Sequence, residues 1–423
     1  MTTTTYLFAL VDGGGTVPPD LAAVRRMVTR GHRVVVLAED TMEDEVRATG
    51  ATFQPWVRAV NRSSRRPEHD PYRDWECKNP MQLFDRLIEL QLVGPAPAYA
   101  ADVDDAIAEH RPSAVVCSFF ALGAMVAAEA AGLPFAVLFP NAYLLPAKGM
   151  PPFGMGLRPA RGPVGRVRDR CLTAMTVRTW DRKGLPGLNQ LRAERGLEPL
   201  EHFWDQVHRA RREIVMTSPA FDFPAALPAN ARYVGPVLDD AGWCDPYSPP
   251  PGDAPLVLVA MSSTFQDQAA SMQRVIDALA ALPVRAVVTT GPAVDPDDVV
   301  APEGIVVIRS APHTAVMKHA AVVVTHGGHG TVMKALAADV PMLVVPHGRD
   351  QPDNAARVVA RGAGLMRKRS ASAEQIRDAL RQLLDDPSYR ENAARLGAVI
   401  RRDARSDELG DALEAIAPGC LTA

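Results

Sequence analysis

Short apolar runs alternate with helical segments along this chain, and this alternation restricts its fold more than any other feature of the sequence. Residues 6–11 form a continuous apolar run of strand length, a helical pattern covers 19–30, and a second apolar run occupies 33–37. Gly31 lies between that helix and the second run, at a position where glycine commonly ends a helix. Continuous apolar runs are typical of strands buried on both faces of a parallel sheet. The start of the chain therefore predicts a βαβ unit.

The same alternation continues in two separate parts of the chain. Apolar runs at 113–117 and 134–138 flank an alanine-rich helical segment at 121–131. Further runs follow at 256–260, 284–289, 304–308, 321–325 and 342–345. The 423 residues also exceed the roughly 250–300 at which a single hydrophobic core stops growing. We predict an α/β fold of two Rossmann-like, doubly wound domains that face each other across a cleft.

A proline-rich stretch marks the boundary between these two domains. We expect an N-terminal domain at 1–235, a linker at 236–252 and a C-terminal domain at 253–400. Residues 401–423 are expected to form a helix and tail that pack back toward the N-terminal domain. Small ligands commonly bind between domains, so we expect the substrates in the cleft.

Composition and charge exclude several classes of partner. The net charge of −3 gives no basic surface for nucleic acid, and no stretch approaches the ~20 apolar residues of a membrane span. The five cysteines are far apart and include no C-x-x-C pair that could hold zinc. The N-terminus lacks the charged and apolar regions of a secretory signal. We therefore expect a cytoplasmic protein without a metal site or membrane contact, which could form a homodimer.

A glycine-rich turn carries the clearest chemical signal. The sequence Thr-His-Gly-Gly-His-Gly-Thr at 325–331 follows an apolar run and opens a helical pattern at about 332–338. Bare backbone N–H groups at a helix N-terminus attract anions such as a diphosphate. Glycines alone would indicate only a tight turn, but His326 and Thr331 add hydrogen-bond donors. A polar loop at 346–354 follows the next apolar run, where it is well placed to hold sugar hydroxyls.

Several segments in this region, taken in order, resemble the donor-binding signature of family 1 glycosyltransferases, most closely the actinobacterial antibiotic-tailoring branch. The resemblance spans about 309–365 and is weaker in the N-terminal half. The segments are Ser-Ala-Pro-His-Thr-Ala-Val at 310–316, the turn at 326–331, Asp-Val-Pro at 339–341, Asp-Gln-Pro-Asp-Asn-Ala at 350–355 and Gly-Ala-Gly at 362–364. The resemblance implies a GT-B fold. It also implies inverting, metal-independent sugar transfer from a nucleotide-diphosphate sugar, without any cofactor, to a small natural-product aglycone.

The resemblance also implies which residues hold the donor. The glycines, His326 and Thr331 would contact the diphosphate. Asp350 and Gln351 would bind the donor sugar, and residues 311–313 would lie beside the nucleobase. The full expected set is Ser263, Thr264, Ala311, His313, His326, Gly327, Gly328, His329, Gly330, Thr331, Asp350 and Gln351. His326 would also act in catalysis, by stabilising charge on the leaving diphosphate.

One departure from the family concerns the nucleotide. Where related enzymes often place a carboxylate that grips both ribose hydroxyls, this chain has Lys334. A donor without a 2′-hydroxyl would lose least from this change. We therefore predict a dTDP-sugar rather than a UDP-sugar.

A second departure concerns the base that deprotonates the acceptor. Gly15 or Thr16 stands where related enzymes usually carry a histidine, and Cys117 and Ser118 stand where its orienting aspartate is expected. Asp12 is the best local candidate for the base, because partial desolvation can raise the pKa of a carboxylate. Asp12 could equally serve only to hydrogen-bond its own glycine turn. A third reading is that the acceptor is acidic and needs no strong base.

The acceptor site is the least defined part of the prediction. Aromatic residues in polar or irregular segments could line an apolar pocket, although aromatics are commoner in cores. The expected acceptor residues are Thr16, Trp75, Phe119 and Phe153. Two other functions remain open from the sequence. They are a nucleotide-sugar epimerase of the same fold and a non-catalytic protein derived from a transferase, the latter because the usual base is missing.

Overall fold

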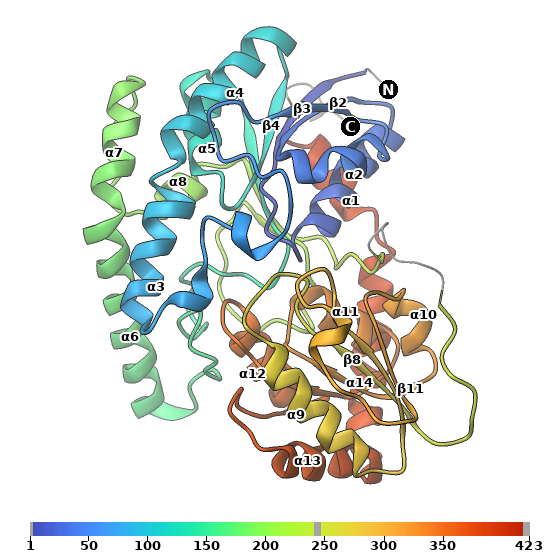
Figure 1. The fold of residues 1–423 in the computed structure, drawn as a ribbon. Coiled ribbons are helices and arrows are strands. Elements are labelled where there is room, and N and C mark those ends of the chain that lie inside the picture. Colours follow the sequence, from blue (N-terminus) through green and yellow to red (C-terminus); the bar gives the residue numbers. More distant parts are fainter. Residues whose placement is uncertain (1–2, 241–246, 418–423) are drawn as a thin grey trace.

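Two parallel sheets organise this computed structural model, which describes residues 3–240 and 247–417 (Figure 1). The first sheet has the order β3-β2-β1-β4-β5-β6-β7 and the second β10-β9-β8-β11-β12-β13. All neighbouring strands within them run parallel. The predicted fold class, two doubly wound α/β sheets, is confirmed.

The first sheet and its helices occupy the N-terminal half. Its strands are β1 (Thr5–Ala9), β2 (Arg33–Ala38), β3 (Thr52–Pro55), β4 (Ala114–Ser118), β5 (Phe135–Phe139), β6 (Arg212–Val215) and β7 (Ala231–Tyr233). Its α-helices are α1 (Val17–Thr29), α2 (Glu43–Arg47), α3 (Pro80–Leu87), α4 (Ala96–His110), α5 (Leu122–Ala130), α6 (Gly162–Lys183), α7 (Leu185–Glu194) and α8 (Asp205–His208). Short turns of other helix types are η1 (Asp40–Met42), η2 (Pro67–His69), η3 (Asp74–Glu76) and the π-helix η4 (Ile88–Leu92).

The second sheet and its helices follow. Its strands are β8 (Leu256–Ala260), β9 (Arg285–Thr289), β10 (Ile305–Ile308), β11 (Ala320–Thr325), β12 (Met342–Val344) and β13 (Gly364–Met366). The helices after β8 are α9 (Ala269–Ala280), η5 (Pro296–Asp298), α10 (His313–Met317), α11 (His329–Ala337), α12 (Gln351–Ala360), α13 (Ala373–Asp385), α14 (Ser388–Ala404) and α15 (Glu408–Glu414).

Burial on both faces explains the continuous apolar runs. Along β1, Leu7 and Ala9 belong to one core cluster while Tyr6 and Phe8 belong to the cluster on the other face. The central strand β8 of the second sheet divides in the same way between two clusters. A strand covered by helices on both faces needs apolar residues at every position, so period-two alternation is absent.

The C-terminal helices connect the two halves of the molecule. Helix α14 packs against α11, and α15 lies beside α1 of the first half (Figure 1). Arg30, the C-cap of α1, pairs with Asp407, Asp411 and Glu414, at 2.7 Å in each case. The end of the chain thus returns to the first sheet. Residues 241–246 of the predicted linker and 418–423 of the predicted tail lie outside the described residues.

Candidate active site

A cavity of about 1030 Å³ is lined by residues from both halves of the molecule. On one side are segments that follow β1 and β4, and on the other are segments that follow β8, β11 and β12. These are the carboxyl ends of parallel strands, where α/β sheets commonly bind ligands. The predicted residues on its wall are Asp12, Thr16, Trp75, Phe119, Phe153, Ser263, Thr264, Ala311, His313, His326, Gly328, His329, Gly330, Thr331, Asp350 and Gln351. The structure therefore brings the expected donor and acceptor residues onto a common cavity.

Gly327 is the predicted site residue that is not on this wall. Its φ is +97°, and a Cβ at this position would lie 2.7 Å from Val344 Cγ1 and 3.1 Å from the Gln351 carbonyl oxygen. Only glycine fits this left-handed and crowded position without strain. Gly327 therefore allows the tight turn but does not itself line the cavity.

The glycine-rich turn leads directly into α11. Gly328 is the N-cap of this helix, and His329, Gly330 and Thr331 form its first turn. The helix begins three residues earlier than the sequence pattern indicates, because small and polar residues at its start hide the helical periodicity. The N–H groups of a first turn have no partners within the helix. A Cβ added at Gly330 would meet nothing within 4 Å, so this turn opens into the cavity.

His326 lies against the base of this turn as a neutral imidazole. Burial, reinforced by nearby His347, lowers its pKa to about 3, although a hydrogen bond with the Ala260 backbone opposes the shift. The side chain is 9% exposed and lines the cavity. His326 can therefore offer a hydrogen bond at neutral pH but no positive charge.

His329 turns its side chain toward the first half of the molecule. Its Nε2 lies 2.8 Å from Thr217 Oγ1, and its ring meets Phe221 edge-on at 6.0 Å. Burial lowers its pKa to about 3. The imidazole thus ties α11 to the segment after β6, and the part of His329 free for an anion is its backbone N–H.

Asp350 is the N-cap of α12 and Gln351 is the first residue of that helix, and of the two only Asp350 has a side-chain oxygen, Oδ1, without a hydrogen bond from another described residue. The Gln351 side chain is buried, with 2% exposed. Its amide oxygen accepts a hydrogen bond from the backbone N–H of His347 at 2.7 Å, and its amide nitrogen donates to the amide oxygen of Gln266 at 2.8 Å. Asp350 Oδ2 accepts from Asn354 at 2.8 Å, and burial raises the pKa of Asp350 to about 6. Gln351 therefore shapes the loop, while Asp350 can bind a hydroxyl.

Asn354 connects the sugar loop with the glycine-rich turn. Its amide nitrogen donates both to Asp350 Oδ2 and to the Gly327 carbonyl, at 2.8 and 2.9 Å. Asn354 is not among the site residues predicted from the sequence, although it lies in the resembling segment. Its role follows from a contact 27 residues apart in the chain, which no local pattern reveals.

At the other end of the donor half, a carboxylate from the predicted linker meets Lys334. Lys334 Nζ lies 2.9 Å from Asp240 Oδ1, and Asp240 Oδ2 accepts from Thr314 N–H at 3.1 Å. Burial raises the pKa of Asp240, but Lys334 and Thr314 outweigh it and the net shift is downward. His313 lies nearby with Nε2 3.0 Å from Thr289 Oγ1, and burial lowers its pKa to about 4. Asp240 is a site residue that is not predicted from the sequence.

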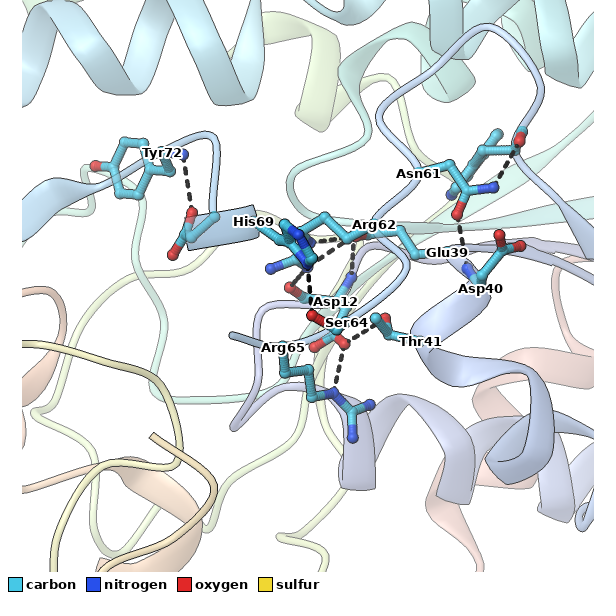
Figure 2. Close-up of polar contacts among 12 residues, drawn as sticks. Asp12, Glu39, Asp40, Thr41, Asn61, Arg62, Ser64, Arg65, His69 and Tyr72 are labelled. Carbon is cyan, nitrogen blue, oxygen red and sulfur yellow. Dashed lines mark hydrogen bonds and ion pairs between the residues drawn. The ribbon is translucent and has the colours of Figure 1, made fainter. Parts of the chain in front are cut away.

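Asp12 sits in a network of ion pairs, which Figure 2 shows in close-up. Its Oδ2 accepts from Arg65 Nε at 2.7 Å and from Thr41 Oγ1 at 2.8 Å, and its Oδ1 accepts from Gly14 N–H at 2.9 Å. Arg62 donates to the Asp12 carbonyl and pairs with Glu39. Burial raises the pKa of Asp12, but Arg65 and Arg62 outweigh it, so the pKa falls below its usual value. The expected rise in this pKa is wrong, because the sequence does not reveal the two arginines.

The positions where related enzymes carry the base are open or apolar here. A Cβ at Gly15 would meet nothing within 4 Å. Thr16 Oγ1 is buried without a hydrogen-bond partner among the described residues, and Cys117 is a buried thiol whose pKa is raised by burial. The histidines on the described cavity wall are His313, His326, His329 and His347, all from the second half. The described acceptor side thus presents no imidazole.

The acceptor side of the cavity is largely aromatic. Phe119 is buried and stacks on Trp204 at 5.3 Å, and Phe153 is 38% exposed. Trp75 meets Phe265 of the second half edge-on at 5.1 Å. Two further aromatic residues on the same wall, not predicted from the sequence, are Phe84 of α3 and Trp180 of α6, whose rings lie 4.3 Å apart. This surface suits a bulky apolar ligand.

Two searches of the described residues bear on other classes of site. No helix within 3–240 and 247–417 is long and apolar enough to cross a membrane. In the same part of the chain, no three histidine, cysteine or acidic side chains gather in a group that could hold a metal ion.

Comparisons with known proteins agree with this geometry. The family model described as "Erythromycin biosynthesis protein CIII-like, C-terminal domain" matches residues 273–416. The 4′-demethylrebeccamycin synthase of Lentzea aerocolonigenes is 28% identical over 97% of this chain and 98% of that protein. The structure of CalG4, the calicheamicin glycosyltransferase, has a TM-score of 0.77 and 25% identity over 98% of both chains. The glycosyltransferase of kitacinnamycin has a TM-score of 0.78 at 22% identity, over 98% of this chain and 99% of that one.

The fold, the cavity and these matches define a glycosyltransferase with the GT-B architecture. Residues 273–416 match the erythromycin CIII-like family model, and the whole chain is similar to family 1 enzymes of the natural-product tailoring branch. These matches favour a glycosyltransferase over the epimerase and the non-catalytic protein, the two alternatives left open by the sequence.

Proposed function

We propose that this enzyme moves a deoxysugar from a dTDP-linked donor to a natural-product aglycone, with inversion at the anomeric carbon and without a metal ion. The observation that carries the proposal is the shared cavity, in which the start of α11 and Asp350 lie across from an aromatic wall. The related fold of the spinosyn rhamnosyltransferase SpnG was solved in complex with spinosyn aglycone, at 17% identity, which supports an aglycone acceptor. The related fold of VinC was solved in complex with dTDP, at 18% identity.

The diphosphate is assigned to the first turn of α11. Its N–H groups and the Thr331 hydroxyl would bind phosphate oxygens, and the helix dipole adds about half a positive charge. Neutral His326 would donate its one ring N–H to the same anion instead of to the Ala260 backbone. These preorganised donors stabilise the negative charge on the departing diphosphate, the task that a metal ion performs in other transferases.

In this proposal the donor sugar lies on one side of the diphosphate and the nucleoside lies on the other. Asp350 would accept a hydrogen bond from a sugar hydroxyl, with Ser263 and Thr264 close to the phosphates. The nucleoside would lie beside Ala311, His313 and Lys334. Since Lys334 and Thr314 occupy the Asp240 carboxylate, a deoxyribose is favoured over a ribose.

Inversion follows from a single displacement. The acceptor atom approaches the anomeric carbon from the aromatic wall and forms the new glycosidic bond. The bond from that carbon to the diphosphate oxygen breaks on the opposite face, beside α11. The acceptor's proton is released to a weak base or to solvent, because every Asp12 oxygen already accepts hydrogen bonds and its pKa is lowered. An acidic acceptor, such as a phenol, fits this environment better than a simple alcohol.

A turnover assay tests the proposal. Purified enzyme is incubated with dTDP- and UDP-sugars and a panel of aromatic aglycones, with and without EDTA, and products are identified by mass spectrometry and NMR. We expect acceptor-dependent release of dTDP, full activity in EDTA and a β-glycoside from an α-linked donor. Retained configuration, loss of activity in EDTA or a preference for UDP-sugars would each contradict the corresponding part.

The cytoplasmic location and the homodimer predicted from the sequence belong to this proposal as well. The five cysteines are odd in number and lie far apart in the chain, which fits a reducing cytoplasm. Light scattering on the purified chain would measure its mass in solution, and a monomer at working concentrations would contradict the homodimer.

A further inference from the structure

The loop that carries Asp350 is held on both sides by the opposite half of the molecule. On the N-terminal side of Asp350, Arg349 pairs with Asp74 of η3. On its C-terminal side, Asp353 accepts hydrogen bonds from the backbone N–H groups of Gly154 and Gly156, the latter at 2.8 Å. The residue assigned to the donor sugar therefore lies between two anchors on the acceptor half.

The Arg349 anchor has the geometry of a strong ion pair. Arg349 Nε and Nη2 lie 2.6 and 3.0 Å from the two oxygens of Asp74, a bidentate arrangement. The third nitrogen, Nη1, donates to Thr264 Oγ1 at 2.9 Å in the loop after β8. The side chains are 29% and 9% exposed, so the pair is shielded from water and salt more than a surface pair.

A ring contact lies beside the ion pair. Trp75, which follows Asp74, meets Phe265, which follows Thr264, with centroids 5.1 Å apart and planes at 83°. Two consecutive residues of the acceptor half thus contact the donor half. We call this set the latch: Asp74, Trp75, Thr264, Phe265 and Arg349.

The backbone on both sides of the ion pair adopts the left-handed region. Arg349 has a φ of +57°, and Arg73, next to Asp74, has a φ of +39°. Side-chain-bearing residues rarely adopt these angles, which cost free energy and persist where the surrounding contacts hold them. Without the ion pair, both segments are expected to relax toward ordinary angles, and Asp350 follows Arg349 directly.

We propose that the latch positions the donor-sugar loop and couples it to the acceptor segment, with Asp74 and Arg349 as positioning residues for Asp350. The segment around η3 also supplies cavity wall, including Tyr72 and Trp75, so an acceptor in the cavity would contact the same segment that holds the sugar loop. Closing the latch would orient the sugar for the acceptor and keep water from the anomeric carbon. This inference rests on the proposed function in so far as Asp350 is assigned to the sugar.

The test compares the wild type with Asp74→Asn and Arg349→Lys. Asparagine removes the charge, while lysine keeps it and loses the bidentate geometry. We expect kcat for transfer to fall about 10- to 100-fold in Asp74→Asn, because small misplacements of reacting groups cost this much. Affinity for dTDP should change less than about threefold, since the α11 turn is untouched. The share of donor lost to hydrolysis, in which water replaces the acceptor, should rise, and Arg349→Lys should lie between.

Asp411→Asn is the matched control, because it removes a 2.7 Å ion pair with Arg30 that also joins distant parts of the chain, away from the cavity. Hydrogen exchange of residues 347–353 gives a readout that does not depend on turnover. Faster exchange there in Asp74→Asn, and not in Asp411→Asn, supports the latch. Unchanged exchange, or an unchanged ratio of transfer to hydrolysis, would overturn it. Absence of dTDP binding in the wild type would overturn the donor assignment instead, while the exchange result still decides the latch.

Discussion

Lys334 of α11 and Asp240, from the segment between the two sheets, form an ion pair with 2.9 Å between Nζ and Oδ1. The pair lies on the cavity wall, at the end assigned to the nucleoside. Thr314 occupies the other carboxylate oxygen. A carboxylate is therefore present near the expected ribose position, but both of its oxygens are engaged.

The first prediction concerns nucleotide choice. Replacing Lys334→Gln frees Asp240 Oδ1 to accept a ribose hydroxyl. The preference for dTDP over UDP should then fall about tenfold, equal to about 1.4 kcal/mol. Calorimetric titration of both nucleotides against wild type and variant measures the change. An unchanged ratio of dTDP to UDP affinity would show that this ion pair does not discriminate between deoxyribose and ribose.

His326 gives the second prediction. His326→Ala should lower kcat about 10²- to 10³-fold, the typical cost of losing one preorganised donor to a developing oxyanion. Because its pKa is lowered to about 3, the imidazole is neutral throughout pH 5–9, and the loss should be equal at pH 6 and pH 8. Acceptor affinity should hardly change. A defect that titrates near pH 6.5 would mean that a charged histidine is required, contrary to the burial of this side chain.

Asp12 gives the third prediction, in which stability and rate respond differently. Asp12→Asn removes one of the two carboxylate partners of Arg65, which keeps its ion pair with Glu45, so the unfolding free energy should fall by about 1.5–3 kcal/mol, measured by chemical denaturation. Turnover per folded molecule should stay within about tenfold of the wild type. General bases typically contribute about 10²–10⁴ in rate, so a loss of that size with native stability would restore Asp12 as the base.

The sequence predicts the sheets well because their signal is local. The strand β8 occupies the predicted residues, and β1, β2, β4 and β5 differ by one or two positions at their ends. The sequence does not predict helix α6, because Trp180 is its single buried residue among those described and the helix therefore has no apolar stripe. Strand β3 is also not predicted. Its residues are exposed or half-buried, so the strand needs no apolar run and leaves none in the sequence.

The donor turn could be located from the sequence, whereas the electrostatics of the site could not. Motif order identifies the 325–331 turn and the 350–355 loop, which the fold brings onto one cavity. The lowered pKa of Asp12 depends on Arg65, more than fifty residues away in the chain. The Asp240–Lys334 and Asp74–Arg349 pairs join residues 94 and 275 positions apart. Such long-range partners leave no periodic pattern in one sequence.

The fourth prediction uses Asp20 of α1, whose two carboxylate oxygens are buried without a hydrogen-bond partner among the described residues. Burial raises its pKa well above the usual value. The protonated form is thus favoured in the folded state, so this group's contribution to stability is full below about pH 4 and is lost as pH rises toward the raised pKa.

Asp20→Leu should therefore stabilise the protein by about 1–3 kcal/mol at pH 7, since an unsatisfied buried polar group is replaced by an apolar one of similar size. Denaturation curves between pH 4 and pH 8 should also become less pH-dependent. A loss of stability at pH 7 would show that the carboxyl group has a role that its surroundings do not reveal.

The central claim, that the first turn of α11 binds the donor diphosphate, is tested most directly by filling that space. Gly330 has no positive φ, lies in the helix and faces open cavity, so Gly330→Leu can be accommodated by the fold while its side chain occupies the diphosphate position. Titration calorimetry of dTDP should show tight binding to the wild type, weaker binding to Gly330→Ala and a loss of at least about 100-fold in Gly330→Leu, at an unchanged melting temperature. Equal dTDP affinity in the wild type and in Gly330→Leu would contradict the account.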